Sequence, residues 1–198
     1  MHEPTALLKN LSKRVRMTSQ EVGEVTAAFE CIEQPRNGEL QQQGYPCHYL
    51  YYVASGACKS YVTTRDGKEK IVMFALPDWW ITDIDSLSNG GASTITIKTL
   101  MPTVLYRIAK PALTRLLAQS TAFESAFRYM MQHAYIREQR RTLSLITDDA
   151  VTRYQRLINE HPRLEQIASQ KDIAAYLGIT PEFLSATKRQ LRDEHVLR

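Results

Sequence analysis

Cysteine is scarce in this sequence, and its pattern argues against several classes of protein. The chain of 198 residues contains 3 cysteines, namely Cys31, Cys47 and Cys58. An odd number at wide spacing argues against a disulfide framework, and no pair has the C-x-x-C spacing of a zinc or iron–sulfur site. We therefore expect reduced thiols, no bound metal and no cofactor.

Long apolar runs are missing as well. No run approaches about 18 apolar residues, the length expected of a membrane span. The opening stretch MHEPTALLKN lacks the apolar segment of a signal peptide. These absences predict a cytoplasmic protein with no membrane partner. With 43% hydrophobic residues, the chain is long enough for one large domain or two small ones. A net charge of +4 is compatible with nucleic-acid binding without requiring it.

Groupings that could support catalysis are absent too. Between residues 31 and 108, His48 is the only histidine, so the facing histidine and carboxylate ligands of a metal-dependent enzyme are not available. The stretch SLSNGGAS is rich in glycine but lacks the lysine of a phosphate-binding P-loop. We therefore predict no catalytic residue and no enzyme.

The sequence changes character along its length. Residues 1–30 have helical spacing, with Thr18 as a helix start and Glu21 three residues later. Residues 31–108 contain short β-rich runs between turn signals. YLYYVASGACKSYVTT holds two strands around a tight Ser55-Gly56 turn, RDGK marks a hairpin, and ITIKTL and TVLYRI look like a further strand pair. These runs predict a small antiparallel barrel or roll.

Residues 110–147 are predicted to form two helices. Pro111 suits the first turn of one helix, and Ser120 suits the cap of a second, longer helix. The longer helix carries a broad apolar stripe, composed of Phe123, Phe127, Met130, Met131, Ala134, Ile136 and Leu143. Such a stripe needs a surface to cover it. A second copy of the same helix would cover it in a homodimer, which we favour, and packing on the chain's own barrel is the alternative.

The most specific motif lies near the C-terminus. In SQKDIAAYLGITPEFLSATKRQL, Ser169 caps a short helix and Asp172 can close a capping box. Gly178 then permits a tight turn, and Thr180 and Pro181 begin the next helix. This order of signals is typical of a helix-turn-helix, whose second helix enters the major groove of DNA.

The residues expected to contact DNA follow from that geometry. The exposed face of the second helix is predicted to present base and phosphate readers, which are Glu182, Ser185, Lys188 and Arg189. The start of the first helix, at Ser169 and Gln170, is placed to meet a phosphate. The alternative is a structural helical hairpin with a solvated charged face.

On these motifs the chain resembles the CRP/FNR family of bacterial transcription regulators. KDIAAYLGITPEFLS is similar to the family's helix-turn-helix, and YYVASGACKSYVTTRDGKEKIVMFALPDWW is similar to its central β-roll. DWWITDIDSL and the short C-terminus look most like the branch common in Bacteroidetes. The resemblance implies an α+β fold. A cyclic-nucleotide-binding-like, cupin-like β-roll sensor domain with flanking helices would span 1–119, a dimerisation helix 120–147 and a helix-turn-helix domain 148–198.

The resemblance also implies a function. Such proteins are homodimers that bind two-fold symmetric double-stranded DNA and recruit or block RNA polymerase. Glu182 matches the family's acidic base reader, with Thr180 as a backbone contact, whereas Pro181 and Ala186 stand where the family usually has arginine or another polar reader. The usual half-site sequence is therefore not expected. The sequence ends at EHVLR, where other members continue into a β-hairpin wing, so we expect a wing that is shortened or missing.

The effector of the sensor region is a separate question. Nucleotide-binding members of the family carry a Gly-Glu pair and, further on, an Arg-Ser pair. In this chain Pro77-Asp78 stands in place of the Gly-Glu pair, and GGAST stands in place of the Arg-Ser segment. No arginine or lysine occurs from residue 71 to 97. A buried phosphate without a cation is unfavourable, so we predict no cyclic AMP binding of the usual kind. Trp79, Trp80 and Asp83 are candidates for a pocket that takes an unknown small-molecule effector. The alternative, which we favour, places the tryptophans in the core and makes the aspartate a loop cap.

Two hypotheses therefore remain for the whole chain. The leading hypothesis is a sequence-specific DNA-binding regulator that acts as a homodimer. The second is a small-molecule-sensing β-roll signalling module whose DNA binding is lost or depends on an unknown effector. The intact helix caps and the basic residues Lys188 and Arg189 favour the first.

Overall fold

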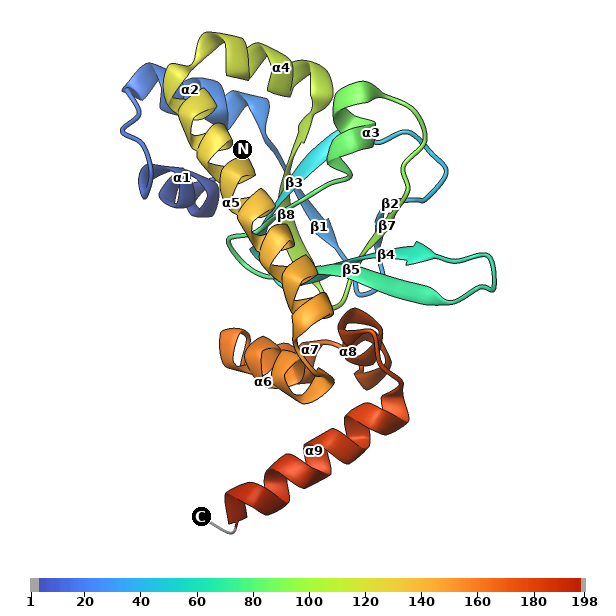
Figure 1. Ribbon diagram of the computed structural model, residues 1–198. Helices are drawn as coiled ribbons and strands as arrows, with labels where there is room; N and C mark the ends of the chain where they lie inside the picture. Colours follow the sequence, from blue (N-terminus) through green and yellow to red (C-terminus); the bar gives the residue numbers. More distant parts are fainter. Residues whose placement is uncertain (1–3, 197–198) are drawn as a thin grey trace.

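The computed structural model describes residues 4–196 as a β-roll with helices at both of its ends (Figure 1). Two 4-stranded sheets, with strand orders β1-β8-β3-β6 and β2-β7-β4-β5, form the roll. All of the strand pairs are antiparallel. The strands are β1 (Glu30–Gln34), β2 (Glu39–Gln41), β3 (Tyr49–Ser55), β4 (Cys58–Thr63), β5 (Glu69–Ala75), β6 (Trp80–Ile81), β7 (Thr96–Thr99) and β8 (Thr103–Ala109). The predicted class, α+β with an antiparallel β-roll, is confirmed.

One group of helices covers one end of the roll, and the C-terminal helices lie at the other end (Figure 1). They are α1 (Thr5–Ser12), α2 (Ser19–Ala28), α3 (Ile84–Asn89), α4 (Lys110–Gln119), α5 (Thr121–Thr147), α6 (Ala150–Glu160), α7 (Leu164–Ile167), α8 (Gln170–Leu177) and α9 (Pro181–Val196). Helix α5 runs past the roll from its helical end to α6, and α9 projects away from the body (Figure 1). No helix among residues 4–196 combines the length and apolar character needed to cross a membrane. The expectation of a shortened or missing wing concerns the end of the sequence, of which residues 197 and 198 lie outside the described residues.

The strands form where the sequence predicts them, but one expected pairing is wrong. Strands β7 and β8, on either side of Met101-Pro102, do not pair with each other, because β7 pairs with β2 and β4 while β8 pairs with β1 and β3. Strands β3 and β4 likewise belong to different sheets. Each short connection therefore carries the chain across the roll from one sheet to the other, so it is a corner rather than a hairpin.

The two corners pack against each other, which explains a glycine at the first. Gly56 has a φ of 87°, and a Cβ atom there would lie 2.5 Å from Thr103 Oγ1 and 2.7 Å from the carbonyl oxygen of Pro102. The Ala57 N–H donates to Thr103 Oγ1 at 3.2 Å, and the Leu100 N–H donates to the Ala57 carbonyl at 2.8 Å. Only glycine combines this backbone conformation with so close an approach.

A carboxylate joins the starts of two helices. Thr18 is the N-cap of α2, at the predicted helix start, and Glu21 closes a capping box there, since its side chain accepts from the Thr18 N–H at 3.0 Å. The same side chain accepts from Ser120 Oγ at 2.9 Å and from the Ala122 N–H at 3.2 Å, at the N-terminus of α5. These hydrogen bonds, with that from Thr18 the largest, lower the pKa of Glu21 to about 2. Ser120 itself caps α5, as predicted, by accepting from the Phe123 N–H.

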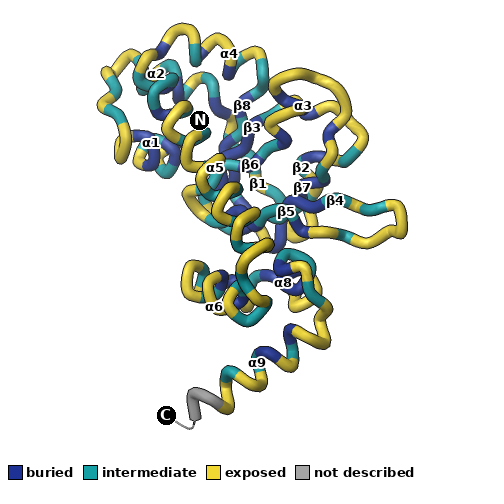
Figure 2. The backbone as a smooth tube through the Cα atoms, in the orientation of Figure 1, coloured by how far each residue is buried: buried dark blue, intermediate teal, exposed yellow. Residues whose placement is uncertain are grey.

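The apolar stripe of α5 does not meet a single surface. Phe123 is buried and its ring centroid lies 6.1 Å from that of Phe29, and Phe127 packs on the same core. Ile136 and Leu143, further along the helix, are 38% and 54% exposed. Figure 2 shows the change from buried to exposed along this helix. Packing on the chain's own body therefore covers the N-terminal part of the stripe only.

The C-terminal helices share a core with the roll. Buried Ile71 and Phe74 of β5 belong to the same apolar cluster as Leu164, Ile173 and Leu184. The rings of Phe74 and Tyr176 have centroids 5.3 Å apart. Helix α8 consequently lies on β5, and the last segment of the chain is positioned by the roll as well as by α5.

Candidate nucleic-acid interface and ligand cavity

Helices α8 and α9 form the predicted two-helix unit, and local signals account for its turn. Ser169 Oγ accepts from the Asp172 N–H at 3.1 Å and so caps α8. Gly178 has φ 73° and ψ 27°, the left-handed conformation that ends a helix. Thr180 Oγ1 accepts from the Phe183 N–H at 3.2 Å, and α9 begins at Pro181. All of these features agree with the sequence-based expectation.

The interior of the unit is closely packed. Leu184 of α9 is fully buried against the inner face of α8 and the rest of the cluster, as predicted for the residue that fixes the helix crossing. Thr187 is also buried. The inner side chains of α8 are Ile173, Ala174 and Leu177. Buried apolar contacts therefore hold the two helices in a fixed mutual orientation.

One contact of α8 differs from the prediction. Asp172 was expected to close a capping box with Ser169, but its carboxylate instead binds Lys59 Nζ of β4 at 2.8 Å. Lys59 also binds Glu69 at 3.0 Å. Only 15% of the Lys59 side chain and 12% of the Asp172 side chain are exposed. Burial acts to lower the pKa of Lys59, but the hydrogen bonds that Lys59 donates to both carboxylates outweigh it and raise the pKa above its ordinary value. The first helix of the unit is thereby tied to the roll.

The predicted readers on α9 do not all face solvent. Glu182 and Arg189 are exposed, and Ser185 is half-buried and donates to Gln170 Oε1 at 3.2 Å. Lys188 was predicted on the exposed face, but only 13% of its side chain is exposed and it forms an ion pair with Glu165 of α7. The expectation of an exposed Lys188 is therefore wrong in this conformation.

The remaining candidates lie near the start of each helix. Ser169, Gln170 and Thr180 are exposed, with Ser169 and Thr180 at the N-caps. The sequence reasoning missed Phe183, whose side chain is 50% exposed in the first turn of α9 next to Glu182. Its signal was a large apolar residue outside the inward-facing positions of this helix. That these residues contact DNA stays a prediction.

The candidate effector residues line one cavity between the roll and α5. Its volume is about 500 Å³, and Trp79, Trp80 and Asp83 all contribute to its wall. The opposite wall comes from α5 and includes Met130, Met131, Tyr129, His133, Ala134 and Arg137. The three residues are thus brought together, and their binding of an effector stays a prediction.

Asp83 also has a structural role. It caps α3 by accepting from the Ser86 N–H at 3.2 Å, and it accepts from Ser93 Oγ and the Thr94 N–H at 2.9 Å each. Burial acts to raise the pKa of Asp83, but these hydrogen bonds lower it below its ordinary value. Trp80 packs on Tyr52 with ring centroids 5.1 Å apart. Loop capping and core packing therefore account for much of what these side chains do.

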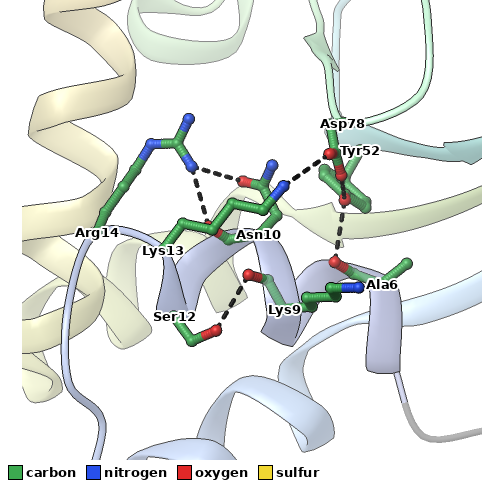
Figure 3. A network of polar contacts seen from close by, with 8 residues as sticks. All are labelled: Ala6, Lys9, Asn10, Ser12, Lys13, Arg14, Tyr52 and Asp78. Carbon is green, nitrogen blue, oxygen red and sulfur yellow. Dashed lines mark hydrogen bonds and ion pairs between the residues drawn. The ribbon is translucent and has the colours of Figure 1, made fainter.

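At the Pro77-Asp78 turn, the carboxylate of Asp78 is bound by other residues of the chain. Asp78, at φ 72°, accepts from the Tyr52 hydroxyl at 2.5 Å and from Lys13 Nζ at 3.0 Å. Figure 3 shows both contacts, with Arg14 and Asn10 of the same network beside them. The Tyr52 hydrogen bond is the main reason that the pKa of Asp78 lies below its ordinary value. The carboxylate is therefore used in holding α1 to the roll.

Comparison with known proteins identifies part of this architecture. Residues 33–120 match the family described as the cyclic nucleotide-binding domain. The match covers the strands from β2 to β8 and the cavity residues of the roll. No curated protein sequence matches the chain at a significant level.

Solved structures extend the likeness to nearly the whole chain. FixK2 from Bradyrhizobium japonicum has a TM-score of 0.72 and 22% sequence identity, with 84% of this chain and 86% of that chain covered. The c-di-GMP-responsive global regulator CLP from Xanthomonas campestris has a TM-score of 0.72 and 15% identity, covering 90% and 93%. A protein from Eubacterium rectale described as a transcriptional regulator of the crp/fnr family has a TM-score of 0.71 and 14% identity, covering 90% and 85%. The predicted resemblance is thus confirmed at the level of the fold.

Proposed function

We propose that this chain, which contains a cyclic nucleotide-binding domain and has the fold of the CRP/FNR-family transcription regulators, is a sequence-specific DNA-binding regulator that acts as a homodimer. Residues 1–119 would form the sensor domain, 120–147 the dimerisation helix and 148–198 the DNA-binding domain. The observation that carries the proposal is the α8–α9 unit. Its caps, Gly178 turn and buried Leu184 match the requirements of a helix-turn-helix, and Glu182 and Arg189 are exposed, which supports the proposal.

DNA recognition would combine two kinds of contact. Glu182 and Phe183 lie in the first turn of α9, the part of a recognition helix that approaches base edges. A glutamate can accept from cytosine N4, and an exposed ring can contact the methyl group of thymine. Arg189 and the exposed start of α8 at Ser169 would contact phosphates. Lys188 would join them only by exchanging Glu165 for a phosphate.

The exposed part of α5 supports the dimer. Ile136 and Leu143 lie seven residues apart and are 38% and 54% exposed. Ile146, three residues after Leu143, is 76% exposed. An apolar seam with this spacing is the pattern through which two parallel helices pack. A two-fold symmetric pair would present two α9 helices to two half-sites about one helical turn apart.

The sensor cavity differs from that of a cyclic AMP receptor in its charges. Asp78 is bound by Tyr52 and Lys13, and Asp83 by the loop at Ser93 and Thr94. The roll side of the cavity contributes no cation among its lining residues. We therefore propose that cyclic AMP of the usual binding mode is not the effector. RNA polymerase is the partner through which such a dimer would act.

The second candidate function is a sensing module without DNA binding. The inward-facing Lys188 is the observation that favours it, because a basic reader is then missing from the free surface. The two candidates differ in one simple property, which is salt-dependent affinity for duplex DNA.

That property can be measured by fluorescence anisotropy with a labelled duplex of random sequence. The affinity of the wild-type protein should fall steeply as the salt concentration rises. Arg189→Ala should weaken binding and reduce the slope of log affinity against log salt by about 1. Arg128→Ala is the matched control, since Arg128 is an exposed arginine of α5 that pairs with Glu124 of the same helix. Equal slopes for the two variants would exclude Arg189 from the interface, and absence of binding by the wild type would support the second candidate.

A further inference from the structure

Arg137 is a cation that lacks the partners a half-buried arginine normally has. It lies in α5, and no carboxylate of residues 4–193, the range whose side chains the structure describes, is within ion-pair distance of it. Its Nε atom is buried without a hydrogen-bond partner. Its guanidinium lies 4.2 Å from the centre of the Trp79 ring, and one of its terminal nitrogens is 3.9 Å from Met73 Sδ. Burial consequently lowers the pKa of Arg137 below its ordinary value.

The other charged groups of the same cavity wall are already partnered. Asp78 and Asp83 have the contacts described above, and Arg14 donates to Asn10 twice and lies over the Tyr129 ring. Glu138 lies 3.9 Å from Arg141. A buried arginine without such partners is costly for folding. A ligand that supplied the missing anionic partner would offset this cost.

Arg137 stands where two cavities meet. It lines the cavity of about 500 Å³ described above, and also a second cavity of about 830 Å³ between α5, β5 and the C-terminal helices. The first cavity is mostly apolar, with Trp79, Trp80 and Met131 in its wall. The second contains three more arginines, which are Arg140, Arg141 and Arg156. Arg141 and Arg156 of this second cavity pair with Glu138 and Asp148. The surroundings of Arg137 therefore change from mostly apolar on one side to charged on the other.

We propose that this cavity binds an amphipathic organic anion, whose apolar body lies between the tryptophans and α5 and whose anionic group binds Arg137. A carboxylate, sulfonate or phosphate fits the forked donor geometry of a guanidinium. The volume is in the range of natural small-molecule sites. Such a ligand differs from a cyclic nucleotide in that its charge is held from α5 and not from the turn at Pro77-Asp78.

The position of Arg137 connects the ligand site with the C-terminal helices. Trp79, on which Arg137 lies, also touches His161 at the end of α6, with ring centroids 5.5 Å apart. An anion bound to Arg137 would therefore alter the contact between the roll, α5 and α6. This regulatory consequence rests on the proposed DNA-binding function, whereas ligand binding itself does not.

The two tryptophans provide the measurement. They are the only tryptophans of the sequence, which contains 2, and both line the cavity. Two probes with the same aromatic body are compared by energy transfer from tryptophan, without DNA. The first is 1-anilinonaphthalene-8-sulfonate, which is an anion, and the second is N-phenyl-1-naphthylamine, which is neutral. The anionic probe should bind the wild-type protein at least about tenfold more tightly.

The variants separate the anion site from general apolar binding. Arg137→Gln should remove the preference for the anionic probe while leaving the neutral probe unaffected, and Arg137→Lys should keep part of it. Arg128→Gln, an exposed arginine of the same helix outside both cavities, should behave as the wild type. Equal affinities for the two probes, or a preference that survives Arg137→Gln, would overturn the proposal. Because no DNA is present, a negative result here leaves the proposed DNA binding untouched, and loss of DNA binding leaves this result untouched.

Discussion

The tie between the roll and the helix-turn-helix unit can be tested by removing one lysine. Lys59 of β4 binds both Asp172 of α8 and Glu69 of β5, at 2.8 Å and 3.0 Å. Lys59→Met keeps most of the aliphatic stem but removes the charge. Asp172 would then remain in an environment that exposes only 12% of its side chain, without the cation that offsets its desolvation.

The expected cost lies between two limits. Removing one partner of a fully buried ion pair costs about 3–5 kcal/mol, and an exposed pair contributes about 0–1 kcal/mol. Lys59 and Asp172 are nearly buried, whereas 37% of the Glu69 side chain is exposed. Water can therefore reach one side of the cluster, and we expect Lys59→Met to lower the free energy of unfolding by about 1–3 kcal/mol.

Urea denaturation followed by circular dichroism measures this loss. Lys98→Met is the matched control. Lys98 lies on β7, opposite Lys59 of β4, and forms an ion pair with Glu39 in which 34% of the Lys98 side chain and 42% of the Glu39 side chain are exposed. The control should cost under about 1 kcal/mol. Adding Asp172→Asn to Lys59→Met should restore part of the lost stability, because the unpaired charge is removed. A Lys59 variant no less stable than the Lys98 variant would refute the reasoning.

Three further predictions concern single residues of the fold. Glu21→Gln should lower the free energy of unfolding at neutral pH. The difference in unfolding free energy from wild type should shrink as the pH falls from about 4.5 to about 2, because the folded-state pKa of Glu21 is depressed and its contribution is lost on protonation. A difference independent of pH would contradict this. Gly178→Ala should cost about 1 kcal/mol in urea and Gly178→Asn less, since asparagine tolerates the left-handed conformation; equal costs would count against the turn as described. Leu143→Asp should produce a monomer in analytical ultracentrifugation while leaving the circular dichroism spectrum unchanged, and a persisting dimer would place the interface elsewhere.

Features that depend on neighbours in the sequence were the ones that could be predicted. The caps at Thr18, Ser120 and Ser169 and the turn at Gly178 were all expected. Each requires a side chain and a backbone group only three residues apart, or a single backbone conformation, so the sequence carries the whole signal.

Features that depend on distant parts of the chain were missed. Asp172 was assigned to a capping box because Ser169 is three residues away, whereas Lys59, which is 113 residues away, binds it. Lys188 was placed on a solvent face by helical spacing, but Glu165 on a separate helix turns it inward. An ion pair between distant residues can replace a local contact only when tertiary packing brings the two residues together. The spacing of residues in the sequence does not predict that packing.

The cavity shows the same limit. Trp79, Trp80 and Asp83 were grouped as candidates because they are close in sequence, and the structure places them in one wall. Arg137 lies 57 residues beyond Trp80, and no local motif marks it. Its importance follows from its contacts with Trp79 and Met73, and from the lack of an ion pair with a carboxylate among the side chains that the structure describes.

The measurement that tests the central claim most directly is selection of bound sequences from a random duplex pool by the purified protein. The selection would use wild-type protein and Glu182→Ala, each with and without 1-anilinonaphthalene-8-sulfonate. The account predicts an inverted repeat with half-sites about one helical turn, or about 34 Å, apart, and relaxed preference at one position of each half-site in the variant. A pool without a symmetric motif under both conditions, or a motif identical for wild type and variant, would contradict the claim that α9 reads DNA.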